Sequence, residues 1–231
     1  DLVGQNAVAH GLDPNLKYDS MKDFAHISLI DLGPNVLVVN PDRPFKTLKD
    51  IVDFARANPG KLDYGYTYAS SGHMAMELLK LRTGTNMLHV PYKGSAPAIV
   101  DTIGGTTQVM FPSLFSAYPQ VTGGKLKALG IAGDKRSSVL PNVPTLKEQG
   151  IPNMNVTQWY ALFAPAKTPK PIIDRLNKEL NLTLNDKANE KKIEDQGAEV
   201  ETGTPDQLKN LVQKEVVRWK KLVDSAKITA D

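Results

Sequence analysis

Two short segments of the chain hold residue types that suit the binding of an anion. Residues 67–73 (TYASSGH) and 90–95 (VPYKGS) each stand between an apolar run and the start of a helical pattern. Hydroxyls donate hydrogen bonds, glycine allows close backbone approach, and a helix start presents free N–H groups and a positive dipole end. The residues concerned are Thr67, Ser70, Ser71, Gly72 and His73 in the first segment and Tyr92, Lys93, Gly94 and Ser95 in the second.

The same residues fit two other interpretations. A serine before a helical pattern is an ordinary helix N-cap, and on the residues alone this interpretation stays open for both segments. Serine and histidine also form the reactive pair of many hydrolases, but Ser70 and Ser71 stand too close to His73 in one local loop. The sequence has no G-x-S-x-G turn and no identifiable third carboxylate, which disfavours a hydrolase.

The sequence disfavours most other kinds of site. It contains no cysteine, which removes thiol catalysis, disulfides and thiolate-bound zinc. Its four histidines lie far apart, and it has neither a G-x-G-x-x-G pattern nor a P-loop, so we expect no metal and no cofactor. The net charge is only +3 and no Lys/Arg block exceeds two residues, which argues against nucleic acid as a partner.

Length and hydropathy bound the class of protein. The 231 residues suffice for one large domain or two smaller lobes. The longest apolar runs, such as residues 36–39, are far too short to span a bilayer. Asp1 does not begin a leader peptide, so we expect a chain that is either cytosolic or already processed. The lack of cysteine fits a periplasmic location.

Alternating strands and helices are predicted to position the two segments. Residues 62–68 and 86–90 are predicted strands, followed by helices at about 73–82 and from Ser95, which is the βαβ pattern of a parallel sheet. Ligands bind such sheets beyond the carboxyl ends of the strands. Further strands are predicted at 26–31, 35–40, 108–111, 125–132 and 156–164, and further helices at 114–121 and after a capping box of Thr47 and Asp50.

The C-terminal part is predicted to be helical. Thr168-Pro169 and Thr204-Pro205 each read as an N-cap followed by proline. The last helix carries an apolar stripe that indicates core packing. Trp159 and Tyr160 are neighbours in an apolar strand and point to opposite sides, so we expect one in the core and the other facing a cleft. We count Trp159 among the candidate ligand-binding residues.

At this point the order and spacing of many short motifs resemble one known family, the extracytoplasmic solute receptors of tripartite tricarboxylate transporters, also called Bug-type receptors. No single motif is specific, but the set covers essentially the whole chain. Its members are Asp19, Asp23-Phe24, residues 57–62 (ANPGKL), 71–73 (SGH), 89–97 (HVPYKGSAP), 123–126 (GGKL), Arg136-Ser137, 140–145 (LPNVPT), Glu148, Gly150, Trp159, Ala164-Pro165, Thr168-Pro169 and Arg218-Trp219.

The resemblance implies an α/β fold of the type II periplasmic-binding-protein kind. Two α/β lobes would be joined by two crossing strands, near residues 30–36 and 156–164, with the ligand held by closure of the lobes. Lobe one would comprise residues 1–31 and 157–231, and lobe two residues 32–156.

The chain departs from the family pattern at its start. Members normally carry roughly 70 further N-terminal residues, including a first strand that ends in a loop resembling Pro-Pro-Gly-Gly and supplies ligand contacts of lobe one. We therefore expect lobe one to be incomplete, through truncation, proteolysis or divergence. An incomplete lobe is expected to expose an apolar surface or to pair with another chain by self-association.

By resemblance, the protein is a periplasmic receptor and not an enzyme. It would capture a small carboxylate for membrane transporter subunits. Residues 70–73 and 92–95 match the two ligand loops of lobe two, which in the family bind mostly through backbone amides and bridging waters, and Lys93 would attract the anion. The ligand stays open between a dicarboxylate, an aromatic carboxylate and an acidic amino acid. The alternative function is a ligand-sensing domain of a regulator or sensor with the same fold.

Overall fold

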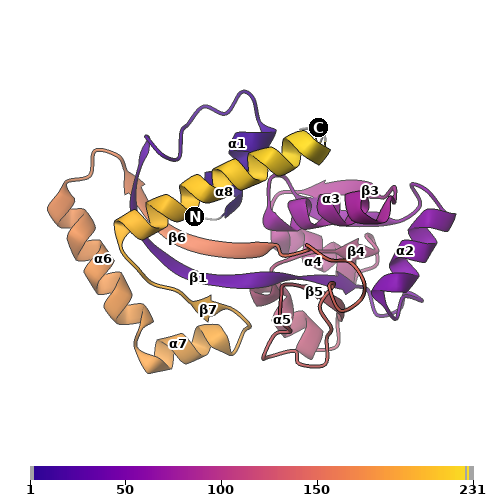
Figure 1. Ribbon diagram of the computed structural model, residues 1–231. Coiled ribbons are helices and arrows are strands. Elements are labelled where there is room, and N and C mark those ends of the chain that lie inside the picture. The colour runs from indigo at the N-terminus through magenta and orange to yellow at the C-terminus, as the bar shows by residue number, and fades with distance from the viewer. Residues whose placement is uncertain (1–2, 227, 229–231) are drawn as a thin grey trace. The chain divides into compact units, whose positions relative to one another are not determined.

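The computed structural model describes residues 3–226 and 228, and the chain forms two compact units (Figure 1). Unit 1 comprises Asp1–Leu32 and Gln158–Asp231, and unit 2 comprises Gly33–Thr157. The chain passes between the units twice, inside strand β1 (Phe24–Val39) and at the first residue of strand β6 (Thr157–Pro165). Each unit is therefore described by itself.

A five-strand path forms the sheet of unit 2. Besides the second half of β1, it contains β2 (Asp63–Thr67), β3 (Leu88–Tyr92), β4 (Val109–Met110) and β5 (Lys127–Ala132), in the order β3-β2-β4-β1-β5. Strands β2 and β3 are parallel, as predicted, and β4 is parallel to β2 as well. The sheet as a whole is mixed, because β1 pairs antiparallel with both β4 and β5. Alternation of strands and helices predicts one layered sheet, but it does not fix the direction of each strand.

Unit 2 contains four helices: α2 (Leu48–Ala57), α3 (Ser71–Thr83), α4 (Ser95–Ile103) and α5 (Leu114–Thr122). The predicted capping box of Thr47 and Asp50 at the start of α2 is confirmed. Helices α3 and α4 cover opposite faces of β2. Tyr64 and Gly65 are successive residues of this strand, so they point to opposite sides, and each meets a different helix. The Tyr64 hydroxyl donates to Glu77 of α3, whereas a Cβ added at Gly65 would lie 3.5 Å from the Ala98 side chain of α4.

Strand β1 is one continuous strand of 16 residues, so the prediction of two separate strands is wrong. The two predicted strands leave out residues 32–34, which include Gly33-Pro34. Instead the pairing partners change there: Asp31 and Leu32 pair with β7 (Glu199–Val200), while residues 35–39 pair with β5. Proline fits extended backbone wherever its missing N–H is not needed. Pro91 likewise lies inside β3, a strand at the end of the sheet path, and not in a loop as predicted.

Helices make up most of unit 1, where β6 and β7 pair with β1. The helices are a π-helix, η1 (Gly4–Val8), and the α-helices α1 (Ala9–Leu12), α6 (Lys170–Leu184), α7 (Lys187–Glu194) and α8 (Pro205–Ala226). The apolar stripe predicted for the last helix is confirmed, because Leu208, Val212, Trp219 and Val223 are buried. None of the helices among the described residues is long and apolar enough to cross a bilayer.

The two predicted threonine-proline helix starts have different outcomes. Thr204 caps α8 as predicted: its hydroxyl accepts from the Gln207 N–H at 3.2 Å, and Pro205 is the first helical residue. The prediction for Thr168 is wrong, because Pro169 itself is the N-cap of α6 and makes no side-chain cap bond. Pro169 has an extended ψ of 140°, which delays the helix by one residue.

Candidate anion-binding site

Three helices of unit 2 begin at the same edge of the sheet. Because β2, β3 and β4 are parallel, their carboxyl ends meet at this edge, and α3, α4 and α5 start shortly after them. The first four N–H groups of an α-helix have no acceptor within the helix, and the dipole places partial positive charge there. The edge therefore favours an anion, and it contains a third loop, residues 111–113, that the sequence interpretation missed.

The start of α3 is capped and closely packed. The Ser70 hydroxyl accepts from the backbone N–H of His73 at 3.1 Å, so this serine is an N-cap and contacts the histidine backbone. A Cβ added at Gly72 would lie only 2.4 Å from the backbone oxygen of Phe111, at the end of β4. Only glycine fits this position, which presses the first turn of α3 against the third loop.

Of the side chains in the first segment, His73 belongs to the core of the unit. It is 5% exposed, and its ring centroid lies 4.5 Å from that of Tyr66. Ser71 is also buried, with 2% of its surface exposed. The Thr67 hydroxyl is buried without a hydrogen-bond partner among the described residues, an arrangement that ordinarily opposes folding. Ser71 and His73 therefore offer the edge mainly their backbone.

The start of α4 is open by comparison. Its N-cap is Gly94, with φ of 110° and no side-chain cap bond, and Lys93 before it is exposed. Ser95, the first helical residue, is half-buried. The Tyr92 hydroxyl donates to Asp101 at 2.7 Å, and burial together with this carboxylate raises the pKa of Tyr92 to about 12. Tyr92 is thus engaged within unit 2, and backbone amides are what α4 presents.

The third loop leads into α5 through a further serine cap. The Ser113 hydroxyl accepts from the N–H of Ser116 at 3.3 Å. Asn35 of β1 is fully buried and donates from Nδ2 to the Phe111 oxygen at 2.9 Å. A signal existed in the sequence, since the predicted strand 108–111 is followed by Ser113 and a predicted helix. The sequence held no signal for the contact between Asn35 and Phe111, because these residues are 76 positions apart.

Trp159 lies elsewhere. It belongs to unit 1 and is 2% exposed, and its indole Nε1 is buried without a hydrogen-bond partner in the part of the chain that the structure describes. This burial fits the core role that the strand pattern allows for one of the pair Trp159 and Tyr160. The assignment of Trp159 to a ligand site stays a prediction.

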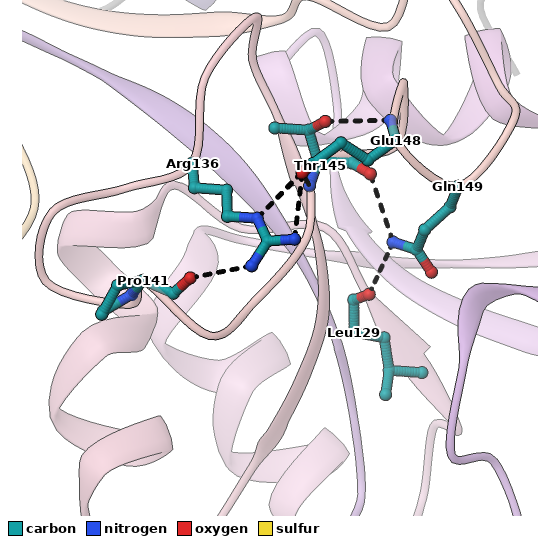
Figure 2. Close-up of polar contacts among 6 residues, drawn as sticks. All are labelled: Leu129, Arg136, Pro141, Thr145, Glu148 and Gln149. Carbon is teal, nitrogen blue, oxygen red and sulfur yellow. Dashed lines mark hydrogen bonds and ion pairs between the residues drawn. The ribbon is translucent and has the colours of Figure 1, made fainter.

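Unit 2 also has a surface pocket of about 430 Å³ beyond the end of β5, which the sequence interpretation did not anticipate. It contains Arg136, whose guanidinium is a type of group that holds carboxylates, but Figure 2 shows that this side chain is engaged by Glu148 and Pro141. Its Nε donates to both carboxylate oxygens of Glu148 at 3.0 Å, and its Nη1 donates to the Pro141 oxygen at 3.1 Å. The pocket is lined by Asp134, Lys135, Arg136, Thr145, Lys147 and Glu148.

The Arg136–Glu148 pair holds an irregular segment in place. Glu148 also accepts from the Thr145 N–H at 2.7 Å. The pKa of Glu148 is lowered to about 2, mainly by the hydrogen bond from Arg136 and next by this backbone bond. Gln149 next to it donates to the Leu129 oxygen of β5 at 2.9 Å. These contacts fasten residues 136–149 to the sheet, so the guanidinium serves the fold.

A buried carboxyl in unit 1 also escaped the sequence interpretation. Asp31 is 8% exposed, and desolvation raises its pKa from 3.8 to about 6. A raised carboxyl pKa means that the folded state holds the proton more tightly than the unfolded state. The contribution of Asp31 to stability is therefore greatest below pH 3.8, falls as the pH rises to about 6, and is lowest above it.

Among the described residues, no three His, Asp or Glu side chains are grouped so that they could hold a metal ion. At the candidate site, the helix starts present mainly backbone amides, and Lys93 is exposed beside α4.

Comparison with known proteins identifies the family of this chain. Residues 3–228 match the family described as tripartite tricarboxylate transporter family receptor. The chain belongs to this receptor family. Protein BugT of Bordetella pertussis is 34% identical over 214 residues, and a protein encoded in the tcbD-tcbE intergenic region of Pseudomonas sp. strain P51 is 34% identical over 220 residues. These matches cover 92% and 94% of this chain and 66% of each relative, so the chain spans just under two thirds of their length.

Solved receptors share the fold. The R. palustris protein Rpa4515, solved with adipate, has a TM-score of 0.95 and 31% identity over 99% of this chain and 77% of its own. The periplasmic binding protein BugD has a TM-score of 0.95 and 29% identity over 100% and 78%. MatC from Rhodopseudomonas palustris, with bound malate, has a TM-score of 0.92 and 30% identity over 96% and 77%. The predicted α/β fold of the periplasmic-binding-protein kind is confirmed.

Proposed function

We propose that this receptor-family chain binds a small carboxylate at the edge of unit 2 where α3, α4 and α5 begin. The observation that carries the proposal is the common origin of three helices at one edge of a parallel β2-β3-β4 array. Each helix start offers N–H donors and partial positive charge to the same region. Unit 2 would then be the ligand-binding lobe two of the receptor.

Backbone amides would do most of the binding at this edge. The first turn of α3, from Ser71 to His73, is held by the Ser70 cap and by the Gly72 contact. The first turn of α4, after Gly94, has no side-chain cap, so its N–H groups are left for solvent or solute. Lys93 would add long-range attraction for an anion. Because the Arg136 guanidinium is engaged by Glu148, a bidentate arginine clamp is not part of the proposal.

The ligand class follows from the chemistry of the edge and from the relatives. Adipate in one solved relative and malate in another are both dicarboxylates. We therefore favour a dicarboxylate, with an aromatic carboxylate or an acidic amino acid as the other candidates. The protein would act in the periplasm as a receptor without catalytic activity and deliver the solute to the membrane subunits of a tripartite tricarboxylate transporter.

A thermal-shift screen tests this proposal. The protein is mixed with malate, adipate, benzoate, nicotinate and aspartate, and in parallel with adipamide, which keeps the chain of adipate but carries no charge. A ligand present at 100 times its dissociation constant stabilises the folded state by about 2.7 kcal/mol. We expect at least one carboxylate to raise the unfolding temperature and adipamide to leave it unchanged. No shift with any carboxylate would reject the proposal.

A further inference from the structure

Asn35 lies where three separate segments of unit 2 meet. It is fully buried in β1, two residues after the point where the chain enters the unit. Its backbone N–H donates to the oxygen of Val156 at 3.2 Å, one residue before the unit ends. Its side chain donates from Nδ2 to the oxygen of Phe111 at 2.9 Å, and its backbone forms an antiparallel bridge with Ser113. One residue thus joins the entry of the chain, its exit and the third loop.

The contact continues from the third loop into the first turn of α3. The Phe111 oxygen that accepts from Asn35 is the same atom that a Cβ at Gly72 would approach to 2.4 Å. The position of this carbonyl therefore limits where the first turn of α3 can lie. The next residue on β1, Val36, donates its N–H to the Pro112 oxygen at 2.9 Å, which holds the same loop from its backbone.

The other end of the Asn35 amide is not explained by packing alone. Its Oδ1 is buried and accepts no hydrogen bond from the described residues. A buried polar atom without a partner opposes folding, so the asparagine carries a cost at its oxygen end. The other end of the amide does have a partner, because Nδ2 donates to the Phe111 carbonyl oxygen.

We propose that Asn35 is a positioning residue of the solute site, which fixes the third loop and the first turn of α3 relative to the two points where the chain enters and leaves unit 2. This inference rests on the proposed function. Asn35 itself need not touch the solute. Its effect passes through the Phe111 carbonyl to the amides of α3.

A matched control exists just after the same strand. Asn40 is also buried, at 5% exposure, and its Nδ2 donates to the oxygens of Thr102 and Ile103 at 3.2 and 2.9 Å. It stands five residues after Asn35, directly past the end of β1, which is about 17 Å at the usual rise of a strand. The backbone N–H of Asn40 donates to the backbone oxygen of Gln108. This residue lies at the amino end of β4, so Asn40 lies at the opposite edge of the sheet. Both side chains donate to buried carbonyls, but only Asn35 does so at the candidate site.

The test compares Asn35→Ala and Asn40→Ala by calorimetric titration with malate and adipate and by thermal unfolding. We expect both substitutions to lower the unfolding temperature. Only Asn35→Ala should weaken solute binding, by about tenfold, which corresponds to about 1.4 kcal/mol. Asn35→Ser, which keeps a small polar side chain that is too short to reach Phe111 in the same way, should weaken binding to a similar extent.

Each contrary result has a distinct meaning. If wild type binds and the Asn35 variants bind within twofold of it, the positioning role is rejected. If Asn40→Ala loses as much affinity as Asn35→Ala, the effect is general loss of stability and the role is also rejected. If neither Asn35 variant folds while Asn40→Ala does, Asn35 is a core residue and the inference fails. If the wild type binds no carboxylate at all, the proposed function fails, and this inference fails with it.

Discussion

The starts of α3 and α4 look alike in the sequence and differ in the structure. Each follows a parallel strand through a short loop with a serine, a glycine and a helical pattern. At α3 the serine caps the helix, and a Cβ at Gly72 would meet the Phe111 oxygen at 2.4 Å. At α4 the cap is Gly94, without a side-chain bond, and a Cβ added there would meet nothing within 4 Å.

The difference shows that a glycine can be required for two unrelated reasons. Gly72 is required because another backbone lies where a side chain would be. Gly94 is required because its φ of 110° and ψ of 165° lie in a region that only glycine adopts readily. The first helix start is therefore rigid and buried, which favours fixed amides, and the second is open to solvent, which favours access.

The largest effect is expected for Gly72→Ala. The added methyl would overlap a backbone oxygen, which cannot rotate away as a side chain could, so we expect a loss of about 3 kcal/mol in the free energy of unfolding. Urea unfolding measures this value. Where the variant still folds, its carboxylate affinity should fall as well, because the first turn of α3 must move. A loss below about 1 kcal/mol would show that the close approach to Phe111 is absent.

Gly94→Ala should cost less, about 2 kcal/mol, because the only penalty is backbone strain. The open space around this position allows a direct check. Gly94→Leu should destabilise by nearly the same amount as Gly94→Ala in urea unfolding, since no atom lies within 4 Å of the added Cβ. A much larger loss for leucine would mean that the start of α4 is packed like that of α3, and the contrast between the two helices would disappear.

Ser70→Ala removes the cap of α3 and should cost about 1 kcal/mol. Thr47→Ala is the matched control, because Thr47 caps α2 with a bond to the Asp50 N–H at 3.2 Å. Helix α2 follows β1, which runs antiparallel to β4, so its start lies at the edge opposite the candidate site. Both variants should lose stability in urea unfolding, and only Ser70→Ala should lose carboxylate affinity. Equal loss of affinity in both would count against the site.

How far the sequence predicted these features depends on how local they are. The capping box of Thr47 and Asp50 and the helix end at Gly84, with φ of 62°, were predictable because each depends on residues within a few positions. The same holds for the loop segments that carry Ser70 and Gly94. Periodicity and turn chemistry act along the chain, and the sequence shows them directly.

The features that distinguish the two helix starts are not local. The approach of Gly72 to Phe111 and the bond from Asn35 to the same carbonyl join residues far apart in sequence. The antiparallel pairing of β1 likewise depends on β4 and β5, two strands that come much later in the chain. Residue types at 35 and 72 are compatible with many arrangements, so only the folded structure shows that they share one carbonyl oxygen.

The smallest effect is expected for Lys93→Ala, which tests whether the open start of α4 receives the anion. Lys93 is exposed, so its loss should leave the free energy of unfolding nearly unchanged. At low ionic strength the affinity for malate should fall a few-fold, and the difference from wild type should shrink as salt screens the charge. Lys61→Ala is the control, because Lys61 is also exposed but precedes β2, at the opposite edge of the sheet. Both variants change the net charge equally. A salt-dependent loss confined to Lys93→Ala would therefore place the anion near α4, and equal losses would mean that only the total charge of the protein matters.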